Sequence, residues 1–188
     1  MSLPLMKNYI NGEWVKSNSE TIGEIWNPAT GEKIAQVAYG TAEDVDKAVQ
    51  AAKNAYWEWR TTPPLTRARY LFRIKEAFEE SFEEIAKVLT TEQGKCIDEA
   101  RGEVRRMIEN VEHATGVTTL MTGYTLEDIA KDIDCMGHKQ PLGVFAAIVP
   151  YNFPGMVAWW FLPYALVTGN TFIVKPSELV PMTQTKIF

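Results

Sequence analysis

Two short apolar runs in the last quarter of the chain flank a longer apolar segment. Residues 144–149 and 171–174 are rich in β-branched and apolar side chains, as expected of strands that are covered on both faces. The segment 155–169 between them has about the length of an average helix and contains Pro163. It predicts a buried crossover helix that is either kinked at Pro163 or starts anew there. The pattern therefore predicts one β-α-β unit of a parallel sheet.

Polar residues follow each of the two predicted strands. Pro150-Tyr151-Asn152-Phe153-Pro154 comes after the first strand, and Lys175-Pro176-Ser177-Glu178 comes after the second. The carboxyl ends of parallel strands share one edge of the sheet, and nucleotides bind at that edge. The amide of Asn152 suits the stabilisation of an oxyanion, although asparagine is also a good helix cap. Lys175 and Glu178 suit either a nucleotide contact or a solvated turn.

Turn and helix signals organise the first 120 residues. Asn11-Gly12 indicates a hairpin, and the segment 27–31, Asn-Pro-Ala-Thr-Gly, marks another turn. Thr41 is the expected N-cap of a helix. Apolar residues then recur at helical spacing in 65–89, which we expect to divide into two helices near Ser81, and a longer helix is expected from Asp98 towards Leu120.

Composition and charge narrow the class of protein. Hydrophobic residues make up 46% and charged residues 23% of the 188 residues, as in ordinary globular chains. The net charge is −5 and no basic block occurs, which argues against a nucleic-acid partner. The apolar segment 155–169 is too short to span a membrane. The start of the chain lacks the basic and apolar regions of a signal peptide, so a cytoplasmic location is expected.

Cysteine and histidine offer little chemistry. The chain has two cysteines, Cys96 and Cys135, too few for a disulfide framework. Cys96 follows Lys95 just before a predicted helix, where a thiol can be activated, but both cysteines are interpreted as bystanders. His113 and His138 are solitary and have no metal-ligand spacing, so no metal site is expected.

Several motifs together resemble the aldehyde dehydrogenase superfamily. They are Pro-Leu-Gly-Val at 141–144, Pro-Tyr-Asn-Phe-Pro at 150–154, Gly-Asn-Thr-Phe at 169–172 and Lys-Pro-Ser-Glu at 175–178. Further stretches are most similar to the CoA-acylating methylmalonate-semialdehyde dehydrogenase branch. These are Gly-Glu-Val-Arg-Arg at 102–106, Val-Glu-His-Ala at 111–114, Leu-Met-Thr-Gly at 120–123 and Ile-Ala-Lys-Asp-Ile-Asp at 129–134.

The resemblance implies roles for particular residues. Asn152 matches the residue that stabilises the oxyanion, and Arg106 matches the arginine that holds the carboxylate of the substrate. The other matched positions line the NAD groove: Val149, Tyr151, Lys175, Glu178 and Leu179. Leu179 stands where relatives often carry arginine. An arginine fork suits a carboxylate, although on residue type alone Arg106 fits a charged helix surface equally well. Arg105 should face elsewhere on the helix.

The resemblance also implies an α/β fold and its division. Residues 1–125 would form N-terminal strands and a helical layer, residues 126–141 an oligomerisation hairpin arm, and residues 142–188 the start of a Rossmann-like NAD-binding sheet. That sheet would be incomplete, and the catalytic domain would be absent from this chain. A homo-oligomer, dimer or tetramer, is the expected assembly. A plain surface hairpin is the alternative at residues 126–141.

The function implied by the resemblance is NAD-dependent oxidation of a short semialdehyde, with malonate or methylmalonate semialdehyde becoming an acyl-CoA. The reaction would pass through a thioester on a cysteine beyond residue 188, and coenzyme A would be the co-substrate. Two alternatives stay open. One is a hydrolytic NAD-dependent aldehyde dehydrogenase, such as a succinate-semialdehyde type, and the other is a non-catalytic truncated fragment or interaction module.

Overall fold

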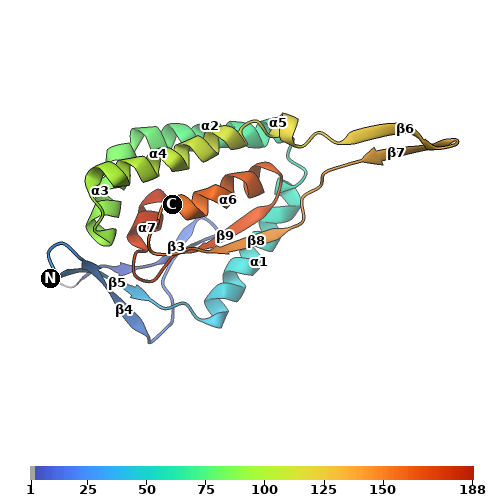
Figure 1. The fold of residues 1–188 in the computed structure, drawn as a ribbon. Helices are drawn as coiled ribbons and strands as arrows, with labels where there is room; N and C mark the ends of the chain where they lie inside the picture. Colours follow the sequence, from blue (N-terminus) through green and yellow to red (C-terminus); the bar gives the residue numbers. More distant parts are fainter. Residues whose placement is uncertain (1–2) are drawn as a thin grey trace.

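A computed structural model describes residues 3–188, so the first two residues of the expected N-terminal segment lie outside the described part (Figure 1). Strands and helices follow one another in a mixed order along the chain. The elements are β1 (Leu5–Met6), β2 (Asn8–Ile10), β3 (Glu13–Val15), β4 (Ile22–Asn27), β5 (Glu32–Ala38), α1 (Ala42–Trp59), α2 (Pro64–Glu80), α3 (Phe82–Gln93), α4 (Ile97–Ala114), α5 (Val117–Leu120), β6 (Tyr124–Ala130), β7 (Ile133–Gly137), β8 (Val144–Ile148), α6 (Met156–Val167), β9 (Thr171–Lys175) and α7 (Met182–Ile187).

The N-terminal strands form two small sheets, and the predicted turns are confirmed. β2 and β3 pair as an antiparallel hairpin. Asn11 and Gly12 connect them with φ values of 53° and 81°, the left-handed region that an Asn-Gly turn requires. β5 pairs antiparallel with β4 and parallel with β1. The turn after β4 is closed by a hydrogen bond from Gly31 N to Asn27 O of 2.8 Å.

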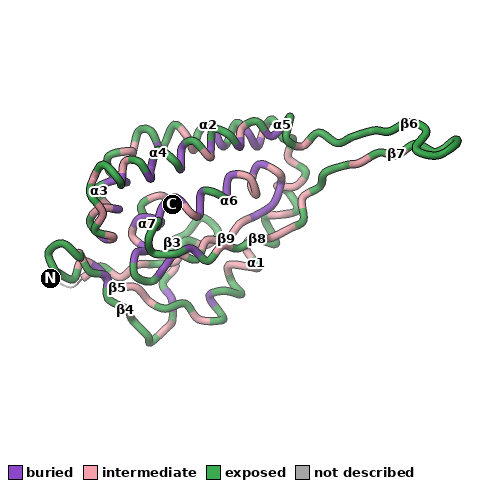
Figure 2. Tube along the Cα trace, in the orientation of Figure 1, coloured by how far each residue is buried: buried purple, intermediate pink, exposed green. Residues whose placement is uncertain are grey.

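Helices α2, α3 and α4 form a helical layer over the β-α-β unit (Figure 1). The predicted division near Ser81 is confirmed, since Ser81 separates α2 from α3. Thr41 caps α1 as predicted, in a capping box with Asp44. The predicted helix from Asp98 to Leu120 is interrupted: α4 ends at Ala114, and the short α5 follows after Gly116. α4 contributes Ala100, Val104, Met107, Ile108, Val111 and Ala114 to the hydrophobic core, and buried segments recur along the helical layer in Figure 2.

The predicted β-α-β unit is confirmed. β8 and β9 pair in parallel with Ile148 opposite Lys175, and α6 connects them. α6 is one helix with Pro163 inside it, so the alternative of a helix that starts anew at Pro163 is wrong. Helix α4 packs against α6, which places the helical layer directly beside the crossover.

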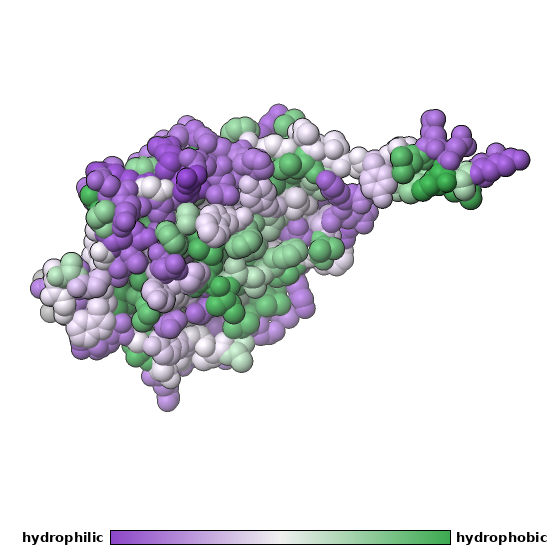
Figure 3. All heavy atoms as spheres, viewed as in Figure 1, coloured by the Kyte–Doolittle hydropathy of each residue, from purple (hydrophilic) through white to green (hydrophobic). Residues whose placement is uncertain are grey.

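The prediction that both strands are covered on both faces is wrong for β8. Ile148 is 82% exposed, and Phe145 is also exposed. The physical reason is that α1 and α6 both pack more extensively against β9 than against β8, and within residues 3–188 β8 has β9 as its one strand partner. The strand therefore forms an apolar edge, and green side chains gather over this region in Figure 3. Phe161 of α6 contributes to the same exposed apolar surface.

The hairpin β6–β7 projects away from the rest of the molecule (Figure 1). It begins at Tyr124, two residues before the predicted arm, and every residue of β6 is exposed. Leu126, Ile129 and Met136 are large apolar side chains that it presents to solvent.

Candidate active site

The register of β8 and β9 brings the two polar motifs to one edge of the sheet. Ile148 and Lys175 are direct partners, and Val149 N donates a hydrogen bond of 3.1 Å to Lys175 O. The chain then diverges into the loop 150–154 after β8 and the turn 175–178 after β9. The strand ends thus lie side by side, as the sequence predicts.

Asn152 lies in the exposed loop that leads into α6. The alternative that it caps α6 is wrong, because the N-cap residue is Gly155. Among residues 3–188, the side-chain amide of Asn152 makes no hydrogen bond that meets ordinary geometric criteria, whereas its backbone oxygen accepts one of 3.0 Å from Lys95 Nζ. The amide of Asn152 is therefore available to a ligand.

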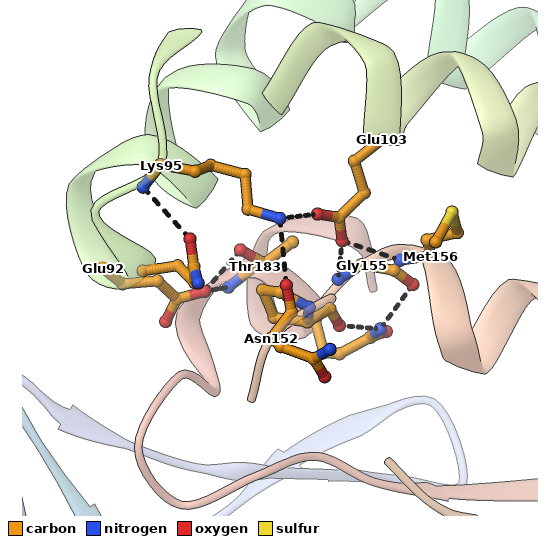
Figure 4. A network of polar contacts seen from close by, with 10 residues as sticks. Glu92, Lys95, Glu103, Asn152, Gly155, Met156 and Thr183 are labelled. Atoms are coloured by element: carbon orange, nitrogen blue, oxygen red, sulfur yellow. Dashed lines mark hydrogen bonds and ion pairs between the residues drawn. The ribbon is translucent and has the colours of Figure 1, made fainter. Parts of the chain in front are cut away.

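A glutamate from the helical layer takes the capping role at α6. Glu103 Oε1 accepts hydrogen bonds from Gly155 N at 2.8 Å and from Met156 N at 3.0 Å. These N–H groups belong to the start of the helix, where backbone donors have no partner within the helix and a negative charge is stabilising. Glu103 Oε2 is 2.6 Å from Lys95 Nζ. Figure 4 shows this network joining α4 to the loop.

A second buried glutamate does the same at α7. Glu92 accepts hydrogen bonds from Met182 N at 2.7 Å, from Thr183 N at 2.6 Å and from the Thr183 hydroxyl. Burial raises the pKa of the Glu92 carboxyl to about 7, although these hydrogen bonds oppose the shift and the negative Glu103 adds to it. Glu92 and Thr183 appear in Figure 4 beside the Lys95 network.

Arg106 lies one helical turn after Glu103 and lines a pocket of about 480 Å³. Lys95, Phe153 and Met156 line the same pocket, so it adjoins the loop that carries Asn152. The side chain of Arg106 is 70% exposed and is 3.0 Å from Glu109 Oε2. Arg105 points to a different place, over the ring of Phe82 on α3 and towards Glu79. Of the two arginines, Arg106 alone lines the pocket.

The predicted NAD contacts differ in exposure. Lys175 Nζ is 3.3 Å from Glu178 Oε2, and both side chains are about half exposed. Hydrogen bonds from its own backbone N–H and from Lys175 lower the pKa of the Glu178 carboxyl. Tyr151 and Leu179 are exposed, whereas the side chain of Val149 is buried.

Sequence reasoning missed the roles of Lys95, Glu103 and Glu92. One signal was available for Glu103, since it falls in helical phase with the buried residues Ala100 and Met107. A carboxylate at such a position needs a partner. Neither cysteine lines the pocket. In residues 3–188 no group of three His, Cys, Asp or Glu side chains could hold a metal ion, and no helix is long and apolar enough to cross a membrane.

Comparison with known proteins identifies the family. The model of the aldehyde dehydrogenase family matches residues 14–188. The chain belongs to the aldehyde dehydrogenase family. The structure is similar to that of a protein from Sinorhizobium meliloti described as a methylmalonate-semialdehyde dehydrogenase in complex with NAD, with a TM-score of 0.95 and 35% identity over 99% of this chain and 38% of that one. The methylmalonate-semialdehyde dehydrogenase of Oceanimonas doudoroffii gives a TM-score of 0.94 and 40% identity, over 98% of this chain and 38% of that one.

Curated relatives in this family carry a related name. Malonate-semialdehyde dehydrogenase 2 of Oceanobacillus iheyensis is 47% identical over 97% of this chain. The malonate-semialdehyde dehydrogenase of Lacticaseibacillus casei is 46% identical over the same share. In both cases the match covers 37% of the relative's length. The aldehyde dehydrogenase fold and the resemblance to the semialdehyde branch are therefore confirmed for this N-terminal region, which spans about 37% of those relatives.

Proposed function

We propose that the protein containing this chain oxidises a short semialdehyde with NAD, and that malonate or methylmalonate semialdehyde is its substrate. The observation that supports the proposal is the arrangement around the loop 150–154. This loop, which carries the Asn152 amide, and the turn with the Lys175–Glu178 pair follow adjacent strand ends. The pocket lined by Arg106 adjoins the same loop at Phe153. The names of the relatives support the substrate class.

Asn152 would stabilise the negative charge that forms in the reaction. When a cysteine thiolate outside residues 1–188 adds to the aldehyde carbon, the carbonyl oxygen becomes an oxyanion. A fixed amide donor is worth most when it is aimed at the oxygen on which charge develops. Loss of hydride from that carbon restores the carbonyl as a thioester, and the thiol of coenzyme A then displaces the cysteine to give an acyl-CoA. Water would release a free acid in the hydrolytic alternative.

Arg106 would select the substrate. A semialdehyde carries a carboxylate at the end away from the aldehyde, and a guanidinium donates two parallel hydrogen bonds to a carboxylate. Arg106 forms an exposed ion pair with Glu109, and exposed pairs are weak enough to exchange for a ligand. The arginine is thus available to an acidic substrate that enters beside Phe153.

The polar side chains after β9, Lys175 and Glu178, suit the ribose of NAD. The Glu178 carboxylate can accept from two vicinal hydroxyls, and it disfavours the additional 2′-phosphate of NADP. Lys175 adds donors at the same place, and backbone groups at Val149 together with Tyr151 and Leu179 would line the groove. NAD would supply the hydride acceptor. A relative of this fold was solved with NAD.

The proposal also includes the oligomeric state, the NAD-binding sheet and the location of the protein. The projecting hairpin β6–β7, with exposed Leu126 and Ile129, would pair with a partner subunit in a homo-oligomeric dimer or tetramer, since an exposed strand edge favours such pairing. Residues 142–188 would be the opening of the NAD-binding sheet, and a cytoplasmic location is proposed.

The test is the turnover of the Asn152→Ala variant of the intact protein with NAD, coenzyme A and malonate semialdehyde. We expect kcat to fall about 100-fold or more. Asn54→Ala, at an exposed position on α1, is the matched control and should keep wild-type turnover. Near-normal turnover of Asn152→Ala would reject the oxyanion role. Omission of coenzyme A separates acylation from hydrolysis, because only the hydrolytic enzyme would sustain turnover without it.

A further inference from the structure

The loop that carries Asn152 is held from the helical layer by one lysine. Lys95 lies in the connection between α3 and α4, and its Nζ donates to Asn152 O at 3.0 Å and to Glu103 Oε2 at 2.6 Å. The same ammonium lies 4.4 Å from the centroid of the Phe153 ring. The Lys95 side chain is 9% exposed and that of Glu103 is fully buried. Figure 4 shows Lys95 reaching across to the loop.

We propose that Lys95 is a positioning residue for the oxyanion site, acting through Asn152. By fixing the backbone oxygen of Asn152 and the neighbouring ring of Phe153, the ammonium sets the direction in which the Asn152 amide points. This inference rests on the proposed oxyanion role of Asn152 and adds a residue to that site.

The loop has few means of fixing itself. Two of the five residues from Pro150 to Pro154 are prolines, which have no backbone N–H to donate. The amide side chain of Asn152 does not cap α6, so it does not restrain the loop either. A catalytic donor that is misplaced by about 1 Å loses a large part of its effect. The loop therefore depends on contacts from outside it.

Glu103 makes the lysine contact rigid. One oxygen of its carboxylate holds Lys95, and the other accepts from Gly155 N and Met156 N at the start of α6. The lysine and the helix on the far side of the loop are thus tied to the same buried group. A buried ammonium needs such a partner, because an unpaired charge in the interior is strongly unfavourable. Glu103 on α4 therefore restrains the chain on both sides of the Asn152 side chain: through Lys95 at the backbone oxygen of Asn152, and directly at Gly155 and Met156.

The alternative is that the network only stabilises the fold. Kinetic coupling separates the two roles. If Lys95 acts through Asn152, its removal matters only while the Asn152 amide is present, and the effects of the two substitutions are then not additive. A purely structural lysine would lower activity by the same factor in either background.

The experiment is a double-mutant cycle on kcat in the intact protein, with NAD, coenzyme A and saturating malonate semialdehyde. Lys95→Met keeps an unbranched aliphatic side chain at this position and removes the ammonium with its contacts to Asn152, Glu103 and the Phe153 ring. We expect it to lower kcat about 10-fold with KM for the aldehyde within about 2-fold, since the lost contact serves the transition state. Combined with Asn152→Ala, it should lower kcat no further than Asn152→Ala alone. Lys75→Met is the matched control and should keep wild-type kcat; it removes two ion pairs, one to Glu79 on α2 and one to Glu112 on α4.

Three results would overturn the inference, and they differ in what else they reject. If Lys95→Met keeps wild-type kcat, or if the losses multiply to about 1,000-fold in the double variant, Lys95 does not act through Asn152 and the oxyanion role stands. If Asn152→Ala itself keeps normal turnover, both proposals fall. Should Lys95→Met fail to fold, Glu103→Gln enters the same cycle. It keeps an oxygen for the α6 N–H groups and removes the charge that holds Lys95, so the same lack of additivity is expected.

Discussion

The buried glutamate at the start of α7 predicts an unusual dependence of stability on pH. Glu92 is 3% exposed and accepts three hydrogen bonds from Met182 and Thr183. Burial nevertheless raises the pKa of its carboxyl from an ordinary value of 4.5 to about 7. Between these two values the folded protein holds a proton on Glu92 that the unfolded chain has released.

The sign of the effect follows from this difference in bound protons. Where the folded state binds more protons than the unfolded state, the free energy of unfolding decreases as the pH rises. Glu92 therefore favours folding most below about pH 4.5, and its contribution is lost as the pH rises through about 7. One pH unit with a difference of one proton corresponds to about 1.4 kcal/mol, so the whole interval corresponds to about 3 kcal/mol.

The perturbation that isolates this contribution is Glu92→Gln, because glutamine has a similar shape and does not titrate. We expect the free energy of unfolding of wild type relative to Glu92→Gln to decrease by about 3 kcal/mol from pH 4.5 to pH 8. The measurement is urea unfolding of both proteins at each pH. Glu76→Gln, at an exposed glutamate of α2, controls for the removal of one negative charge. A difference between wild type and Glu92→Gln that stays constant would show that the three hydrogen bonds outweigh burial and keep Glu92 ionised, and the reasoning would be refuted.

Two further predictions concern the ligands of the site. Arg106→Ala should raise KM for malonate semialdehyde about 10-fold or more and leave KM for propanal unchanged, since only the former has a carboxylate to hold; Arg105→Ala is the control, and equal effects on both aldehydes would reject the clamp. Glu178→Ala should raise KM for NAD about 10-fold and reduce the preference for NAD over NADP, as measured by kcat/KM with each cofactor. An unchanged preference would remove Glu178 from the ribose contact.

The sequence predicted correctly where part of the candidate site lies. The motif after β8 and the motif after β9 were predicted to meet at one sheet edge, and the pairing of Ile148 with Lys175 confirms that they do. Their assigned roles stay predictions until the variants are measured. The prediction that both faces of β8 are buried was wrong. An apolar run indicates that a segment can be buried, but it does not indicate which elements pack against it.

The sequence by itself determined the turns, the helix starts and the β-α-β unit of this protein. An Asn-Gly pair closes the first hairpin, Thr41 starts α1, Ser81 divides two helices, and two apolar runs flank a crossover helix. Each of these signals involves residues that are close together in the chain, and each acts through backbone geometry or periodicity. The motifs at the strand ends also sufficed to indicate the family.

Only the tertiary structure decided how the site is supported. Lys95 meets Asn152 across 57 positions of sequence, Glu103 meets Gly155 across 52, and Glu92 meets Thr183 across 91. No local pattern encodes such pairs, because they exist only once α4 has packed against α6 and α3 against α7. Packing places buried carboxylates next to helix starts that have unpaired N–H groups. The new hydrogen bonds compensate part of the cost of removing water from the carboxylate, and at Glu92 the cost of burial is still the larger of the two.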